Sequence, residues 1–431
     1  MIVLFIINYK STKGGHAIMA KIKIGVFGAH RGMTMIHQLI GNPNAELVAV
    51  CDKYRPSLDE CAKVAESVGI KIALFEKYED FYNCDMDAVV LANYAHEHAK
   101  FGIGLLESGR HIMSEVLTCA NMAQAVQLAE AVEKSGKIYT YAENYCYFNT
   151  TFEMRQRYRR GDIGELMHAE GEYIHDCASI WPSITYGERN HWRNCKNSTF
   201  YCTHSLGPIL FSTGLRPVKV VGIETRNMPF MRELGCTTPS AAMEIIELEN
   251  HAMVKSIHGA LKREPGSINY QLYGSKGSME TDRWAGGNLH VYIEGERNCV
   301  GEHTVYNPPF TIEAATGAGH GGGDFFTTYF FIQNILGDEE AKKNCIDVYQ
   351  AIDMCIPGIL AYRSIVNGNT PQEVPDLRIK EERDKYRNDT FCTAKDVAGD
   401  MYVSPNTQED IEIPDSVYEM VRDKWLRGEP G

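Results

Sequence analysis

A glycine turn and an acidic residue near the start of the chain have the spacing of a dinucleotide-binding site. The turn, residues 28–33, reads Gly-Ala-His-Arg-Gly-Met and joins an apolar run to residues with helical spacing. Backbone N–H groups at such a helix N-terminus bind phosphate. Asp52 ends the next apolar run, where a carboxylate accepts hydrogen bonds from ribose hydroxyls and repels a 2′-phosphate, which favours NAD over NADP. The predicted cofactor contacts here are Gly28, His30, Arg31, Gly32, Met33 and Asp52.

The glycine pattern is incomplete, because His30 stands where a second glycine normally lets the pyrophosphate approach the backbone. A plain strand-to-helix turn without a ligand is the alternative. The surrounding elements favour the cofactor, since apolar strand-like runs alternate with helical spacing: strands at 21–28, 46–51, 86–92, 110–115 and 137–141, and helices at 33–39, 99–107 and 121–135. This alternation predicts an α/β fold with an N-terminal Rossmann domain, a doubly wound parallel sheet, over residues 20–145. Ligands of such sheets lie beyond the carboxyl ends of the strands.

Short motifs that follow two of these strands carry a resemblance to a known family. Asn93-Tyr94 ends one strand, His98 begins the next helix, and Gly109-Arg110-His111-Ile112 precedes Glu115-Val116-Leu117. From about residue 20 to about residue 375 the chain resembles the glucose-fructose oxidoreductase and inositol dehydrogenase family (Gfo/Idh/MocA), which has Thr-Pro, Gly-Lys-His-Val and Glu-Lys-Pro motifs at these places. The resemblance implies NAD as the cofactor, with contacts from Asn93, Tyr94, His98, Glu115 and Asn144.

One residue departs from the pattern of the oxidoreductases. Their Glu-Lys-Pro lysine is thought to assist proton transfer, whereas Val116 of this chain cannot ionise. The NAD-dependent glycosidase branch of the family, which includes alpha-N-acetylgalactosaminidases, has Glu-Val-Pro at this place and a Glu-Asn-x-Cys-Tyr stretch. Residues 143–147 of this chain read Glu-Asn-Tyr-Cys-Tyr and therefore resemble that branch, which makes Tyr145 a candidate for proton transfer.

A strand and an aromatic loop begin the second half of the chain. Residues 167–176 alternate as a sheet strand does, and they place His175 at the strand end, facing the junction of the two domains. The loop that follows combines aromatic faces with polar groups, which suits sugar rings. A packed surface loop is the alternative. The candidate substrate-binding residues in this loop are Trp181, Trp192 and Arg193.

Residues 201–208, Tyr-Cys-Thr-His-Ser-Leu-Gly-Pro, hold the strongest catalytic candidates. The family places a histidine here as the base that takes the hydroxyl proton while hydride leaves the carbon, and His204 matches it. The glycosidase branch has Tyr-x-Thr-His-Gly-Leu-Gly-Pro, which Tyr201 and His204 fit, while Ser205 departs from it. The resemblance therefore implies His204 and Tyr201 as catalytic residues, with His175 and Tyr145 as further proton-transfer candidates.

The rest of the second half predicts strands at 218–223, 242–248, 253–259 and 270–273 and a turn at 274–277. We expect a C-terminal α+β domain with an open, mostly antiparallel sheet over 146–375 and a C-terminal extension over 376–431 that packs on the surface. The exposed sheet face commonly forms dimer or tetramer contacts in relatives, which implies a homo-oligomer. A Gly-His-Gly-Gly run at 319–322 opens an apolar helix, and His320 either binds substrate or caps that helix.

Two activities fit these residues, both on a small-molecule carbohydrate. One is net oxidation of a ring hydroxyl, at C3 if the resemblance holds. The other is glycoside hydrolysis, in which transient oxidation acidifies a neighbouring C–H, elimination expels the leaving group, and water addition and reduction follow with no net redox change. A nucleotide-binding sensor without catalysis is a third hypothesis.

Composition excludes other classes of function. The net charge of −13 repels nucleic acid and anionic membranes. Thirteen cysteines without zinc-like spacing predict free thiols in the cytoplasm, and we expect no catalytic metal. The apolar residues 2–7 are too short to span a bilayer. We also hypothesise that translation starts at Met19, just before the first strand.

Overall fold

The computed structural model describes residues 21–296 and 301–431. The hypothesis of a start at Met19 lies outside these residues. The chain divides into two compact units that are discontinuous in sequence. Of the described residues, the first unit comprises 21–118, 127–148 and 309–351, and the second comprises 119–126, 149–296, 301–308 and 352–431.

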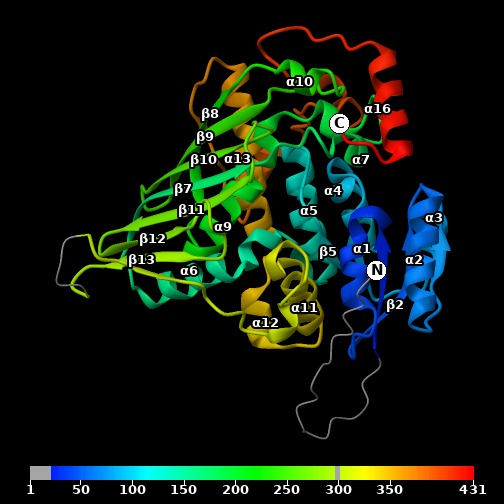
Figure 1. The fold of residues 1–431 in the computed structure, drawn as a ribbon, viewed down its shortest axis with the longest axis horizontal. Coiled ribbons are helices and arrows are strands. Elements are labelled where there is room, and N and C mark those ends of the chain that lie inside the picture. Colours follow the sequence, from blue (N-terminus) through cyan, green and yellow to red (C-terminus); the bar gives the residue numbers. More distant parts are fainter. Residues whose placement is uncertain (1–20, 297–300) are drawn as a thin grey trace, which may run out of the picture. The chain divides into compact units, whose positions relative to one another are not determined.

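The first unit is built on a six-stranded parallel sheet (Figure 1). Its order is β3 (Ala73–Phe75), β2 (Ala45–Cys51), β1 (Ile22–Phe27), β4 (Ala88–Leu91), β5 (His111–Ser114) and β6 (Tyr139–Tyr141). The helices between the strands are α1 (Ala29–Leu39), α2 (Arg55–Ser67), α3 (Tyr78–Tyr82), α4 (His98–Glu107) and α5 (Met122–Ser135), the last belonging to this unit from residue 127. The strand order reverses direction between β1 and β4, so the predicted doubly wound sheet is confirmed.

The core of this unit follows from the apolar runs of the central strands. Because β1 is covered on both faces, Ile24 and Val26 are fully buried, and Met35 and Ile36 of α1 pack against them. The predicted strands and helices of residues 21–141 are all present. The sequence did not predict α2, β3 or α3. In β3 the apolar signal is weak, because the strand has three residues and all are only half buried.

Residues 309–351 also pack on the first unit, whereas the sequence reading placed them in the second domain. Helix α11 (Gly323–Ile335) contributes Phe331 and Ile332 to the core cluster of β1 and α1. Helix α12 (Glu339–Asn344) follows it. Sequence periodicity does not predict this association, because the apolar face of α11 packs on β1 and α1, which lie some three hundred residues earlier in the chain.

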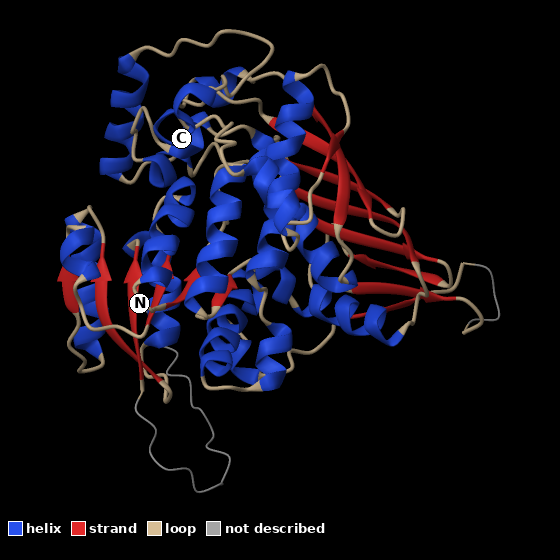
Figure 2. Cartoon of the chain, turned by 180° about the vertical axis from the view of Figure 1, so that it is seen from behind, coloured by secondary structure: helices blue, strands red, loops and turns tan. Residues whose placement is uncertain are grey.

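The second unit is built on a nine-stranded sheet with helices on one face (Figure 2). Its order is β14 (Thr304–Tyr306), β13 (Leu289–Ile293), β12 (Gly277–Thr281), β11 (Ser267–Gly274), β7 (Leu166–Ile174), β10 (Met253–Gly259), β9 (Ala241–Leu248), β8 (Pro217–Glu224) and β15 (Gln372–Glu373). Only β7 and β10 pair in parallel. The open, mostly antiparallel sheet is therefore confirmed.

Helix α9 (Thr203–Thr213) lies directly on this sheet. At Gly171 of β7 an added Cβ would stand 1.8 Å from the carbonyl oxygen of Ser205. Only glycine permits this distance between strand and helix. The close approach fixes the height of α9 above the sheet, and with it the position of His204.

The other helices of the second unit include α6 (Asn149–Arg160), α7 (Trp181–Thr185), α8 (Trp192–Cys195), α10 (Pro229–Arg232), α13 (Val348–Val366), α14 (Lys380–Tyr386), α15 (Lys395–Ala398) and α16 (Asp415–Arg427). Helix α13 belongs to this unit from residue 352. Residues 376–431 do more than cover the surface, because Val421 of α16 is fully buried in a small cluster with Trp181 and Met231.

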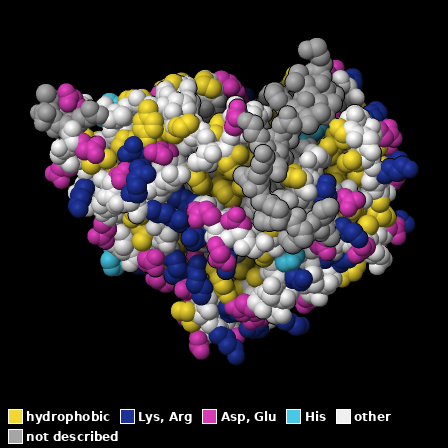
Figure 3. Space-filling model, turned by 90° about the horizontal axis from the view of Figure 1, so that it is seen from below, with side chains coloured by type: hydrophobic (Ala, Val, Ile, Leu, Met, Phe, Trp, Pro, Cys, Tyr) yellow, Lys and Arg dark blue, Asp and Glu magenta, His cyan; other side chains and the backbone are white. Residues whose placement is uncertain are grey.

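Basic and acidic side chains are interspersed on the face shown in Figure 3. In the part of the chain that the structure describes, we find no helix with the length and apolar character needed to cross a membrane.

We predict that Gly171→Ala shifts α9 away from the sheet and lowers the free energy of unfolding by more than about 2 kcal/mol, because backbone must move to admit the methyl group. The matched control is Gly104→Ala inside α4, where the added Cβ meets nothing within 4 Å. Helix propensity makes that change stabilising by up to about 1 kcal/mol. Denaturant unfolding of both variants checks this, and equal behaviour of the two would contradict it.

Candidate functional site

The predicted cofactor residues gather at the carboxyl edge of the six-stranded sheet. Gly28 follows β1 with φ of 98°, and a Cβ there would stand 2.3 Å from the backbone of Ala92. At Gly32 a Cβ would stand 2.6 Å from Val26, so the second glycine lets α1 pack on β1. The N-terminus of α1 has no side-chain cap and no acidic residue in its first turn. Such a terminus suits the pyrophosphate of a dinucleotide.

Asp52 lies directly after β2, as predicted. Its Oδ2 accepts a hydrogen bond from the backbone N–H of Ala29 at 2.7 Å, and its Oδ1 accepts one from Tyr54 at 2.8 Å. These bonds hold the carboxylate beside the start of α1. Each oxygen keeps a further lone pair, which a ribose hydroxyl can use.

Two buried amide oxygens at this edge lack a hydrogen-bond partner. They are Oδ1 of Asn93, after β4, and Oδ1 of Asn144, after β6. The nitrogens of both amides are engaged, with Glu97 at 3.1 Å and with Asp324 at 2.9 Å. A buried acceptor without a donor costs about 1–3 kcal/mol. The donor groups of a nicotinamide nucleotide would satisfy both oxygens, so these residues fit NAD.

A cluster of charges lies at the same edge. Arg31 of α1 donates to Glu115 at 2.6 Å and to Asp324 at 2.9 Å, and His320 lies 2.7 Å from the other Asp324 oxygen. Burial would raise the pKa of Asp324, but the hydrogen bond from His320 and the charge of Arg31 hold it well below its usual range. Burial raises the pKa of Glu115 despite Arg31. Asp324 is therefore the firmly ionised carboxylate of the cluster.

His98 contacts the backbone of the segments that follow β4 and β5. Its ring is buried, with Nδ1 3.1 Å from the carbonyl oxygen of Leu117 and Nε2 3.2 Å from that of Asn93. Burial lowers the pKa of His98 to about 4, so the ring is neutral at pH 7. Both ring nitrogens face protein carbonyls, which makes His98 a support for Asn93.

Of the other predicted residues of the first unit, Tyr145 lies beside this cluster. The ring centroid of Tyr145 is 4.8 Å from that of Phe148 and 6.2 Å from that of His320. The cap of α11 is Gly322, so His320 serves Asp324 instead of capping the helix. His30 is exposed, and Met33 packs against the core. Lys53 stands 4.4 Å over the ring of Tyr94.

The second unit brings His204 and Tyr201 together, as predicted. Their ring centroids lie 4.9 Å apart with the rings at 86°. Tyr173 of β7 completes the group, with its ring 4.8 Å from His204 and 6.1 Å from Tyr201. One imidazole thus lies between two phenols, three groups that can each hold or transfer a proton.

Buried hydrogen bonds hold His204 in place. The Tyr270 hydroxyl donates to the backbone carbonyl of His204 at 2.5 Å. The Ser205 hydroxyl lies 2.8 Å from that of Ser256, which donates to Glu244. His258 lies 2.7 Å from the other Glu244 oxygen. Ser205, the departure from the glycosidase motif, is therefore part of a polar network that ties α9 to β10 and β9.

Some of the predicted loop residues lie beside Tyr201 and Tyr173, whereas Trp181 packs elsewhere. Trp192 lies 6.1 Å from Tyr201, and the Arg193 guanidinium stands 4.3 Å over the Trp192 ring. The ring of His175 is 6.2 Å from that of Tyr173, and its Nδ1 is 3.2 Å from the Cys177 thiol. Trp181 instead packs in the α7–α16 cluster and donates to Asn194 at 3.0 Å.

Sequence reasoning did not single out Tyr173, Lys196 or Asp324. Tyr173 could have been found from the alternation of β7, because it shares a face with Gly171. Lys196 and Asp324 have no local signal, since only the fold brings them to Tyr201 and Arg31.

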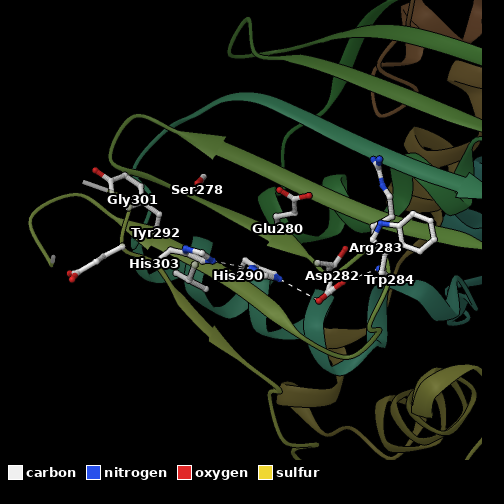
Figure 4. Close-up of a pocket in the computed structure, with 12 residues that line it drawn as sticks. Ser278, Glu280, Asp282, Arg283, Trp284, His290, Tyr292, Gly301 and His303 are labelled. Carbon is white, nitrogen blue, oxygen red and sulfur yellow. Dashed lines mark hydrogen bonds and ion pairs between the residues drawn. The ribbon is translucent and has the colours of Figure 1, made fainter. Parts of the chain in front are cut away.

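A separate hollow of about 620 Å³ lies at the β12–β13 end of the nine-stranded sheet (Figure 4). His290 and Asp282 belong to its lining, with His290 3.1 Å from His303 and 3.5 Å from Asp282. None of the predicted site residues lines it. Within residues 21–296 and 301–431, we find no group of three or more His, Cys, Asp or Glu side chains that could hold a metal.

Two family models match the chain. Residues 22–143 match the oxidoreductase family with the NAD-binding Rossmann fold (Gfo/Idh/MocA), and residues 240–381 match the C-terminal domain of glycosyl hydrolase 109. Residues 22–143 therefore have the NAD-binding domain of the Gfo/Idh/MocA family, and the resemblance to that family is confirmed. The resemblance to the glycosidase branch is also confirmed, and the chain is an enzyme with an NAD-binding domain.

Relatives and solved structures agree with this Gfo/Idh/MocA assignment. Glycosyl hydrolase family 109 protein 1 of Phocaeicola vulgatus is 27% identical over 404 residues, which cover 83% of this chain and 84% of that protein. The family 109 protein of Saccharopolyspora erythraea is 25% identical over 392 residues, covering 83% of each chain. An inositol dehydrogenase homolog from Azotobacter vinelandii has a TM-score of 0.66 at 15% identity, covering 84% of this chain and 100% of its own. Levoglucosan dehydrogenase has a TM-score of 0.68 at 15% identity, covering 83% and 100%. These two likenesses show the fold.

We predict that Arg31→Met destabilises the protein by about 3 kcal/mol, because it leaves the buried Asp324 and Glu115 carboxylates without their cation. The matched control is Arg55→Met, which removes an exposed pair with Asp59 and costs less than about 0.5 kcal/mol. Denaturant unfolding at pH 7 measures both variants. Similar losses in the two would show that the charge cluster contributes no more than a surface ion pair.

Proposed function

We propose that this enzyme is an NAD-dependent glycoside hydrolase that cleaves its substrate through transient oxidation of a ring hydroxyl, with no net redox change. The observation that carries the proposal is the group of His204, Tyr201 and Tyr173 in the second unit. Net oxidation needs one base for the hydroxyl proton. Elimination and water addition need further proton-transfer groups, and this cluster supplies them.

The residues divide the work as follows. Gly28, Asp52, Asn93 and Asn144 hold NAD, which supplies a reversible hydride acceptor. His204 takes the proton of the ring hydroxyl that becomes a carbonyl. That carbonyl acidifies the neighbouring C–H, and Tyr173 or Tyr201 takes this proton as a phenolate, while His175 as an imidazolium or Tyr145 as a phenol protonates the leaving oxygen. Water then adds to the resulting double bond, and reduction of the carbonyl restores the hydroxyl.

Two further facts favour hydrolysis. Val116 leaves no ionisable group at the position where the oxidoreductases of the family have lysine. The C-terminal domain model and the curated relatives carry the glycosyl hydrolase 109 name. Net oxidation of a glycoside or cyclitol remains the second candidate, because the named structural neighbours are dehydrogenases that share the fold.

The test follows free sugar and the absorbance of NADH together when the purified enzyme is incubated with a panel of aryl glycosides. We expect release of the aryl group without NADH accumulation. His204→Asn is expected to lower turnover about 10²–10⁴-fold, the range for loss of a general base. The matched control is His251→Asn, since His251 is exposed in the same unit and its φ of 66° is one that asparagine tolerates.

Stoichiometric NADH without cleavage would replace hydrolysis by net oxidation. Unchanged turnover of a proven substrate by His204→Asn would remove the catalytic assignment of His204 in both schemes.

We propose further that the enzyme works in the cytoplasm as a homo-oligomer. The helix-free face of the nine-stranded sheet presents exposed apolar side chains, among them Ile223, Met253 and Tyr292, as an association surface would. Light scattering on protein isolated from the cytosolic fraction of native cells is expected to give a multiple of the chain mass of 48.4 kDa. A single-chain mass, or recovery of the protein only from the medium, would contradict the corresponding part of this proposal.

A further inference from the structure

Two cations lie against the catalytic group of the second unit. The Lys196 ammonium stands 3.5 Å over the ring of Tyr201 and 4.9 Å over that of Trp192. The Arg193 guanidinium stands 4.3 Å over Trp192 and 5.8 Å over Tyr201. Both positive charges therefore share the rings of Trp192 and Tyr201, of which Tyr201 lies against His204.

Neither cation has an acidic partner. Every Asp and Glu of the chain lies among the described residues, and no carboxylate oxygen comes within 4.0 Å of the Lys196 amine or the Arg193 guanidinium. The first acidic residue after β7, Asp176, is bound by Lys262 at 3.0 Å. In the first unit, by contrast, Arg31 has two carboxylates.

Aromatic stacking and the hydrogen bond between Arg193 and Tyr201 supply no counter-charge for these buried groups. The attraction of a cation to an aromatic ring is smaller than the free-energy cost of removing an ion from water. Burial lowers the pKa of the Lys196 amine well below its usual range, and the neighbouring charge of Arg193 lowers it further. A bound anion would relieve both effects.

We propose that Lys196 and Arg193 bind a carboxylate or sulfate group of the substrate, so that the enzyme acts on acidic sugars. The proposal rests on the proposed function for the place of the sugar ring and adds the class of substrate. The planar guanidinium suits two oxygens of one acid group, and the lysine amine adds a second charge to the same group. Tyr201, which contacts both Lys196 and His204, then lies beside the sugar ring.

The experiment measures binding, which does not require turnover. Quenching of tryptophan fluorescence is titrated with a methyl glucuronide, a methyl glucoside 6-sulfate, the neutral methyl glucoside and inorganic sulfate. We expect at least tenfold tighter binding of the anionic glycosides than of the neutral one, and weaker binding of the anions at 0.5 M than at 0.05 M salt. The glucuronide and the 6-sulfate distinguish carboxylate from sulfate recognition.

Variants assign the preference to the two cations. Lys196→Met and Arg193→Gln are expected to reduce it to less than threefold, and Lys196→Arg to retain most of it. The control is Lys219→Met on β8, which removes a partly exposed cation paired with Glu247 and leaves the preference intact. Far-ultraviolet circular dichroism shows that each variant is folded.

Equal affinity for acidic and neutral glycosides, or a preference that survives both neutral substitutions, would overturn the proposal even if the enzyme hydrolyses glycosides. Failure of every anion to bind, inorganic sulfate included, would overturn it as well. A preference that depends on Lys196 and Arg193 in an enzyme that cleaves no glycoside would sustain the anion site and count against hydrolysis.

Discussion

The ion cluster around Arg31 is the interaction on which the first unit depends. Asp324 is almost completely buried, and an isolated carboxylate there would cost several kcal/mol. Arg31 supplies its counter-charge, and His320 and Asn144 add hydrogen bonds. Because Arg31 also binds Glu115, one guanidinium joins the first turn of α1, the end of β5 and the start of α11. The cofactor edge and the distant segment 309–351 are therefore held by the same charges.

Much of the first unit could be predicted from the sequence, because its strands are buried on both faces and read as short apolar runs. The glycine turn and Asp52 have roles that local spacing determines, and the structure gives both the expected surroundings. The association of residues 309–351 with this unit could not be predicted in the same way. It depends on the packing of Phe331 and Ile332 against β1 and α1, a contact between residues that no local pattern connects.

The second unit shows the same division between local and distant information. Its strands and the approach of α9 to β7 rest on alternation and on glycine. Strands β7 to β11 were predicted, whereas β12 to β15 were not. The residues around His204 come from β7, α8, the turn before α9 and α9 itself. Motif reasoning found Tyr201 and His204 because they are close in sequence. It did not find Tyr173, whose significance depends on which face of β7 meets α9, nor Lys196, which matters only through its position over Tyr201.

The two units differ in how their buried charges are compensated, and this difference bears on function. In the first unit, Arg31 is paired with carboxylates of the protein, and two buried amide oxygens have no hydrogen-bond donor. That arrangement suits a cofactor that stays bound, because the protein is stable around the site and gains hydrogen bonds from the ligand. In the second unit, Lys196 and Arg193 have no acidic partner in the protein, which suits a substrate that binds and is released. One fold hosts both dehydrogenases and hydrolases, so the activity must follow from such residues and not from the fold. Val116 removes a proton-transfer group from the first unit, and Tyr173, Tyr201 and His204 concentrate such groups in the second. On the proposed function, the chemistry beyond hydride transfer therefore falls to the second unit, where we propose that Lys196 and Arg193 select the substrate.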